Sequence, residues 1–202
     1  MTEVRVWVDP SCPWAWQTVR WLLELRRLER IRLTWRLFSL EVNSSPAGTP
    51  FADAAPRHGP ALVALAHARE RLGAPAFEAL FVALGERLHE RKLEPSDAVL
   101  SDAAEAAGLG HLLAEAVARV DLGDALIAEH HAARQLDVFG VPTLGIADHK
   151  VVYGPIVANA PTGSDALALW EDVRRFAERP DLFELKRWPR DVPPGGRRTD
   201  GS

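Results

Sequence analysis

Residues 61–138 show only helical periodicity, and signals for β-strands lie on both sides of this stretch. On the N-terminal side, the pattern predicts a strand, a helix that begins at Pro13 and a second strand. On the C-terminal side, two short strands flank a turn at Asp148-His149, and a last helix begins at Ser164. The strands are expected at residues 3–8, 31–38, 143–146 and 151–153. This order favours an α/β sheet domain that is split in sequence by an all-helical insertion.

Two segments outside the regular pattern are expected to lack secondary structure. Residues 42–60 are rich in Pro, Ser, Gly and Asn, which is typical of a loop. The tail at residues 189–202 contains Pro193-Pro194-Gly195-Gly196 and is expected to be flexible. Inside the helical stretch, one helix is expected to start near Ser96 and to stop at Gly108, which suits a C-terminal cap.

The composition is that of an ordinary globular protein. The chain has 202 residues, of which 47% are hydrophobic and 26% are charged, enough for one domain with a large insertion. Its net charge of −4 argues against a nucleic-acid partner, which usually meets a basic face. No apolar run has the length of a signal peptide or a membrane span, so a cytoplasmic location is expected and no membrane partner.

Cys12 is the one cysteine of the chain, so it can form no internal disulfide and no Cys-rich zinc site. It lies between the end of the first strand and Pro13, at the start of a helix. The free N–H groups of a helix start favour a thiolate, and we therefore expect the pKa of this thiol to be lowered. The competing interpretation is a small, buried and inert side chain.

A second segment, Gly140-Val141-Pro142-Thr143, precedes the third strand. A proline at this point cannot donate to a sheet ladder. If the Val141–Pro142 bond were cis, the neighbouring backbone would be open to an extended chain or a small thiol. From the sequence alone a trans bond is favoured, because only about 5–6% of X-Pro bonds are cis.

Taken together, these segments resemble the thioredoxin fold with a helical insertion of the DsbA type. More closely, the chain resembles the actinobacterial mycothiol-dependent nitroreductase branch of that superfamily. Kappa-class glutathione transferases and 2-hydroxychromene-2-carboxylate isomerases share the architecture. The similar segments are Asp9-Pro10-Ser11-Cys12-Pro13-Trp14-Ala15-Trp16, Phe38-Ser39-Leu40, His130-His131, Gly140-Val141-Pro142-Thr143, Gly154-Pro155 and Phe183-Glu184-Leu185-Lys186-Arg187. We expect a discontinuous thioredoxin-like domain at 1–41 and 139–188, with a helical insertion domain at 57–138.

The resemblance implies roles for the matching residues. Cys12 would be the nucleophilic thiolate, Pro13 and Trp14 would shape the active-site turn, and Pro142 would be a cis-proline facing Cys12. Val141 would offer its backbone to a bound thiol. Ala15 departs from the pattern, because many relatives have there a second cysteine that resolves the mixed disulfide.

Without that cysteine, an external low-molecular-weight thiol must resolve a mixed disulfide of Cys12. Of the 24 basic residues only Lys92, Lys150 and Lys186 are lysine, a bias typical of GC-rich coding that favours mycothiol over glutathione. The expected function is that of a monothiol oxidoreductase that uses mycothiol as cosubstrate. The resemblance implies that it reduces nitroaromatic or other electrophilic small molecules, and it leaves a homodimer open.

Two other functions remain open. In a thiol-dependent transferase or isomerase, Cys12 or Ser11 would polarise the sulfur of the bound cofactor without forming a disulfide. In a redox-inactive binding module, Cys12 would be inert. No metal is expected, because the adjacent His130 and His131 lack the spacing of a helical zinc site. Packing or solvent exposure is the favoured role for these two histidines, with a substrate contact as the alternative. Asp9 is expected to cap a turn, since a charge there would raise the thiol pKa.

Overall fold

The computed structural model describes residues 1–119, 121–146, 150–187 and 192–196. Its sheet has the order β2-β1-β3-β4, in which β1 pairs in parallel with β2 and antiparallel with β3, and β4 is antiparallel to β3. The strands are β1 (Thr2–Val8), β2 (Ile31–Leu37), β3 (Thr143–Ile146) and β4 (Lys150–Tyr153). The strand–helix–strand unit and the hairpin strands are therefore confirmed, whereas the expected turn at Asp148-His149 lies outside the described residues.

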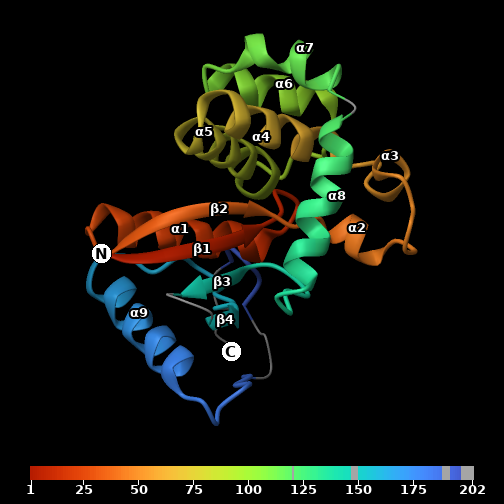
Figure 1. Cartoon of the computed structure of the whole chain (residues 1–202). Coiled ribbons are helices and arrows are strands. Elements are labelled where there is room, and N and C mark those ends of the chain that lie inside the picture. The colour runs from red at the N-terminus through yellow and green to blue at the C-terminus, as the bar shows by residue number, and fades with distance from the viewer. Residues whose placement is uncertain (120, 147–149, 188–191, 197–202) are drawn as a thin grey trace, which may run out of the picture.

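The helices form two groups (Figure 1). Two long helices belong to the sheet domain, namely α1 (Pro13–Arg27) and α9 (Gly163–Glu178). The helical stretch contains α4 (Gly59–Leu72), α5 (Ala74–Gly85), the π-helical turn η1 (Glu86–Glu90), α6 (Asp97–Ala106), α7 (Gly110–Val117) and α8 (Asp121–Arg134). Figure 1 shows α4 to α7 as a layer beyond β2, with α8 running from that layer back to the sheet. A thioredoxin-like sheet with a helical insertion is the result.

The prediction of a loop at residues 42–60 is wrong in part, because two short helices lie in this region. These are α2 (Leu40–Ser44) and α3 (Phe51–Ala54). Ser39 caps α2 by accepting a hydrogen bond from the Val42 amide at 3.2 Å. In α3, Phe51 is buried against Gly59 and Gly123 of the helical stretch. Tertiary packing thus makes helices of a segment whose composition favours a loop.

The core is continuous between the sheet and the helical layer. Val4, Val6 and Val8 of β1 are fully buried, as their alternation predicts. On the α1 side, the Trp21 indole donates a hydrogen bond to the Ala166 carbonyl of α9 at 3.0 Å. On the side of the helical layer, Trp35 of β2 packs against two phenylalanine rings of α5. The sheet therefore packs against both groups of helices.

An ion pair takes the place of a neighbouring strand along part of the β2 edge. The Glu129 carboxylate accepts a hydrogen bond from the Leu37 amide at 3.1 Å, and Arg69 donates to the Trp35 carbonyl at 3.2 Å. The two side chains also bond each other at 3.0 and 2.6 Å. Backbone groups that face the open side of the sheet are thereby satisfied, which protects the edge.

Replacing Glu129 with alanine is therefore expected to lower the free energy of unfolding by about 1.5–3 kcal/mol, because the Leu37 amide loses its acceptor and the Arg69 guanidinium loses its carboxylate partner. Urea unfolding measures this loss. As a matched control, Glu171→Ala removes an exposed ion pair with Arg174 and should cost at most about 1 kcal/mol. Equal losses in the two variants would contradict the proposed capping of the edge.

The described part of the C-terminal tail contacts the sheet domain. The Gly195 amide donates to the Ala158 carbonyl at 2.6 Å, and the Asn159 side chain donates to the Gly196 carbonyl at 2.9 Å. The other residues of the tail for which flexibility was expected, 189–191 and 197–202, lie outside the described residues. Over the residues that are described, no helix is both long and apolar enough to cross a membrane.

Candidate active site

Cys12 is the residue that caps the N-terminus of α1. Its backbone is extended, with φ −89° and ψ 111°, and its Sγ accepts a hydrogen bond from the Ala15 amide at 3.4 Å. Pro13 follows at the first position of the helix, where a missing N–H costs nothing. The Cys12 amide donates to the Asp9 carbonyl at 3.1 Å, which closes a tight turn between β1 and α1. The thiol thus points toward the free amides of a helix start, as the sequence predicts.

The fold brings the Gly-Val-Pro-Thr segment to this thiol. The Val141–Pro142 peptide bond is cis, and the Cys12 thiol donates to the Val141 carbonyl at 3.6 Å. Two hydrogen bonds fix the segment: the Thr143 hydroxyl donates to the Gly140 carbonyl at 2.7 Å, and the Gly154 amide donates to the Pro142 carbonyl at 2.8 Å. Two motifs that are separated by the whole helical stretch therefore meet at one sulfur.

The expected lowering of the thiol pKa is wrong. Cys12 is only 6% exposed, and burial, which disfavours the thiolate, raises its pKa above the ordinary value. Hydrogen bonds from the amides of Ala15 and Trp14 act in the opposite direction, and the charge of Asp9 adds to the increase. The resting thiol is therefore protonated near neutral pH, in agreement with its hydrogen bond to a carbonyl.

The surroundings of Cys12 are apolar. Its buried neighbours include Ala15, Phe38 and Val141, and Trp14 packs against this cluster while remaining half-buried. Tyr153 lies against Gly140, the residue before Val141, and forms an exposed aromatic pair with Phe139, with ring centroids 4.7 Å apart. An apolar small molecule that reaches the sulfur would meet the apolar cluster around Cys12.

Asp9 has the capping role that the sequence suggests. Its carboxylate is fully buried and accepts hydrogen bonds from the Ser11 amide at 2.8 Å and from the Leu40 amide at 2.7 Å. Burial raises the pKa of this carboxyl group, while the two amides oppose that increase. The side chain therefore joins the end of β1, the turn before Cys12 and the start of α2.

The two adjacent histidines of α8 have separate surroundings. His130 is buried and packs against Phe38 with the rings tilted by 32° and their centroids 4.3 Å apart, and burial together with the neighbouring His131 lowers its pKa to about 4. His131 is exposed. Packing is thus the observed role of His130. Within the described ranges, no group of three or more His, Cys, Asp or Glu side chains could hold a metal ion.

One contact at this site has no signal in the sequence. His89 of η1 lies 2.8 Å, measured from Nε2, from the carbonyl oxygen of Pro10, two residues before Cys12. The helical layer thereby reaches the active-site turn. A single histidine inside a helical stretch carries no local pattern, and the π-helical turn that positions it depends on tertiary packing.

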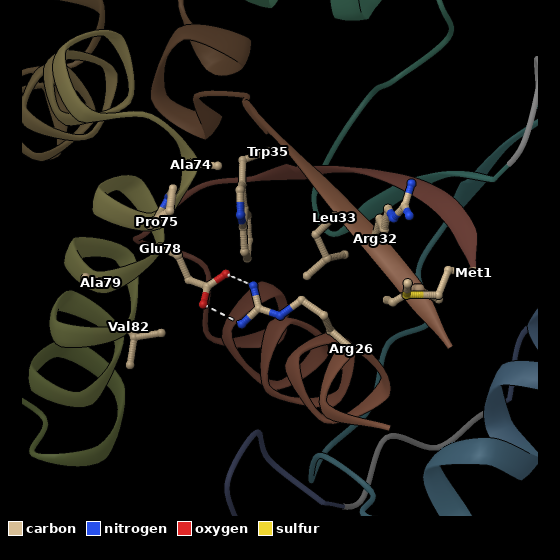
Figure 2. A pocket seen from close by; sticks show the side chains of 11 residues that line it. Met1, Arg26, Arg32, Leu33, Trp35, Ala74, Pro75, Glu78, Ala79 and Val82 are labelled. Atoms are coloured by element: carbon tan, nitrogen blue, oxygen red, sulfur yellow. Dashed lines mark hydrogen bonds and ion pairs between the residues drawn. The ribbon is translucent and has the colours of Figure 1, made fainter. Parts of the chain in front are cut away.

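A groove at another part of the surface is shown in Figure 2. It has a volume of about 610 Å³ and is lined by β2, α5 and the end of α1. Arg26 and Glu78 pair within it, beside Trp35 and Leu33. None of the sequence-predicted site residues lines this groove, so it does not enlarge the candidate active site.

Comparisons with known proteins agree with the fold and the motifs. The model of the Rv2466c-like family, described as mycothiol-dependent nitroreductase Rv2466c, matches residues 11–187. An uncharacterized protein of Mycobacterium tuberculosis, Rv2286c, is 30% identical over 193 residues, which are 93% of this chain and 82% of that protein.

Two solved structures share the fold at low sequence identity. The probable DsbA oxidoreductase SCO1869 of Streptomyces coelicolor has a TM-score of 0.61 at 20% identity, covering 97% of this chain and 98% of its own. The cytosolic disulfide reductase DsbM of Pseudomonas aeruginosa has a TM-score of 0.60 at 16% identity, covering 86% and 99%. With the family match spanning most of the chain, the protein belongs to the Rv2466c-like family and is a thiol-dependent oxidoreductase with a DsbA-like thioredoxin fold.

Proposed function

We propose that the protein is a monothiol oxidoreductase in which Cys12 forms a mixed disulfide that mycothiol resolves. The observation that carries this proposal is the position of the Cys12 sulfur, at the N-terminus of α1 and 3.6 Å from the Val141 carbonyl. A sulfur placed there can be joined to mycothiol by a disulfide, with the electrophilic substrate as oxidant, while a neighbouring extended segment holds the rest of the mycothiol molecule. Family membership favours mycothiol as the cosubstrate.

An external thiol is needed because the chain offers no second cysteine. Ala15, fully buried one helical turn after Cys12, occupies the place where a resolving thiol would stand. The DsbM structure, which shares the fold, was determined with GSH, another low-molecular-weight thiol. These observations favour a cycle in which every disulfide is made with a molecule other than the protein, and such a cycle fits a cytoplasmic location.

Two thiols supply the two electrons that reduce each substrate molecule. The thiols of Cys12 and one mycothiol together give two electrons and two protons to an electrophilic substrate and become joined as a mixed disulfide. For a nitroaromatic compound, the products of this step are a nitroso compound and water. A second mycothiol thiolate then attacks the mycothiol sulfur of that disulfide, which releases the Cys12 thiolate and mycothiol disulfide.

The chain's own residues would bind and orient the reactants. The Val141 backbone would hydrogen-bond the peptide-like part of the bound thiol in place of the Cys12 thiol, and Pro142 would keep that segment extended. Pro13 starts the helix whose amides stabilise the thiolate as it leaves. Trp14 is half-buried next to the sulfur and would cover an aromatic substrate.

A coupled assay tests this function. Reduced mycothiol and a nitroaromatic probe are incubated with the protein, and mycothiol disulfide and the reduced probe are quantified. The proposal predicts one mycothiol disulfide for every two electrons accepted by the probe. Formation of a mycothiol conjugate without disulfide would instead support the transferase or isomerase, and absence of both products would support the binding module.

The raised pKa of Cys12 predicts how the free enzyme responds to pH. Because burial favours the protonated thiol, the rate of alkylation by iodoacetamide should keep rising with pH beyond the ordinary midpoint of about 8.5. Quenched alkylation followed by mass spectrometry measures this profile. A midpoint below about pH 7 would mean that the helix N-terminus outweighs burial, contrary to this account.

A further inference from the structure

The turn over residues 9–12 ends at Cys12 and is closed by the hydrogen bond from the Cys12 amide to the Asp9 carbonyl. This bond does not fix the orientation of the peptide in the middle of the turn. Asp9 and Cys12 are the first and last residues of the turn, and Pro10 is the second, as type I turns favour. Positive φ among the described non-glycine residues occurs at Glu29, Lys92 and Asp137, so Ser11 does not have the conformation of a type II turn. The two types differ in the direction of their central peptide, here Pro10–Ser11.

Both polar groups of this central peptide are bound by side chains. The Ser11 amide donates to the Asp9 carboxylate at 2.8 Å. At the other end, the Pro10 carbonyl lies 2.8 Å from Nε2 of His89. Since a carbonyl can only accept, Nε2 must carry the proton and donate it. A flip of the peptide would break both bonds.

His89 is held in place by buried contacts of the π-helical turn. Arg87 of the same turn is 3% exposed and donates to the Asp102 side chain at 2.6 Å and to its carbonyl at 3.0 Å. Gly85, which precedes the turn, lies against the Trp16 ring of α1, so close that a Cβ there would stand 2.2 Å from that ring. The turn therefore contacts the chain on both sides of Cys12, at Pro10 and at Trp16.

The state of His89 suits a permanent donor. Burial lowers the pKa of this imidazole, the hydrogen bond to Pro10 opposes that decrease, and the smaller effects of Lys92 and His58 add to it while that of Glu90 opposes it. The neutral ring has one N–H, and the contact with Pro10 assigns it to Nε2. The donor is thus available throughout the neutral pH range.

We propose that His89 is a positioning residue of the active site, which together with the Asp9 carboxylate fixes the Pro10–Ser11 peptide and so the direction in which the turn presents Cys12. The helical layer would then set the geometry of the thiol through the turn that precedes it. The effect of His89 on the Pro10–Ser11 peptide is independent of the proposed function, whereas its effect on turnover rests on that function.

Three variants separate positioning from general stability. His89→Leu removes the donor, His89→Gln keeps an N–H at a similar reach, and His111→Leu serves as control because this histidine is exposed on α7. Amide hydrogen exchange of Ser11 is followed by NMR in the absence of mycothiol. Loss of one hydrogen bond predicts about 3- to 10-fold faster exchange in His89→Leu. The glutamine and control variants should stay within about twofold of wild type.

The same variants are then assayed for formation of the mixed disulfide with oxidised mycothiol. We expect about a 3- to 10-fold lower rate for His89→Leu and recovery in His89→Gln. Unchanged Ser11 exchange in a folded His89→Leu protein would overturn the inference, as would equal exchange in the leucine and glutamine variants. If His89→Leu does not fold, His89→Asn, whose side chain is too short to reach Pro10, is compared with His89→Gln under the same criteria.

The two readouts separate this inference from the proposed function. Faster Ser11 exchange without any mycothiol adduct in wild type would leave the positioning role intact and contradict the proposed function. A mycothiol adduct in wild type together with unchanged Ser11 exchange in His89→Leu would contradict the positioning role and leave the proposed function intact.

Discussion

Replacing Cys12 with serine is expected to reduce thiol-dependent turnover by at least about a thousandfold, the range that loss of an essential nucleophile produces. A serine hydroxyl can form no disulfide with mycothiol and is not deprotonated near neutral pH. The structure offers no substitute, because Cys12 is the one cysteine of the chain. The coupled assay with mycothiol and a nitroaromatic probe measures the effect.

Ser11→Ala is the matched control for this variant, since it removes the neighbouring hydroxyl and leaves the sulfur in place. It should keep turnover within a few-fold of wild type if Cys12 acts as the nucleophile. Retained turnover in Cys12→Ser would remove Cys12 from the mechanism. Loss of turnover in Ser11→Ala alone would favour the transferase or isomerase.

Introducing a cysteine at position 15 is expected to let the protein itself resolve the mixed disulfide of Cys12. The Ala15 amide already bonds the Cys12 sulfur, and two residues three apart in a first helical turn lie within the Cα spacing of a disulfide. In Ala15→Cys, the new thiol would attack the mixed disulfide from within the chain and expel mycothiol. Because an intramolecular attack has a high effective concentration, the trapped adduct should fall at least about tenfold.

Ala15→Ser is the control, since it adds a side chain of similar size without a resolving sulfur. It should accumulate the adduct as wild type does. Intact-mass measurement distinguishes the adduct, the internal disulfide and the reduced protein. A persistent adduct in a folded Ala15→Cys protein would contradict the proposal that the missing cysteine explains the need for an external thiol.

Most of the sheet domain can be predicted from local patterns. The alternation of Val4, Val6 and Val8 marks β1, and Pro13 marks the first position of α1. In the helical layer, Ser96 caps α6, and Gly108 has φ +72° just after its end, which suits the expected cap. Such signals act within one turn or strand, so a sequence shows them directly.

The elements that the sequence misses depend on distant contacts. The helices α2 and α3 have 5 and 4 residues, too few for periodicity to distinguish them from a loop. Phe51 is buried in α3 because Gly59 and Gly123 leave room for its ring. The first of these lies near in sequence, whereas the second comes from α8.

The candidate site divides in the same way. The sequence places Cys12 at a helix start, and the resemblance to a family pairs it with Val141 and Pro142, which the structure brings to the thiol. The predicted decrease of the Cys12 pKa is wrong, because the helix amides that favour the thiolate are local in sequence, whereas the burial that raises the pKa arises from the packed fold. His89 reaches Pro10 across 79 positions of sequence and carries no local signal.

The intact mass of the protein after incubation with oxidised mycothiol tests the mixed disulfide of Cys12 most directly. We expect one added mycothiol on wild type, its removal by reduced mycothiol, and no addition to Cys12→Ser. A wild-type protein that stays unmodified at a pH where iodoacetamide alkylates Cys12 completely would contradict this expectation.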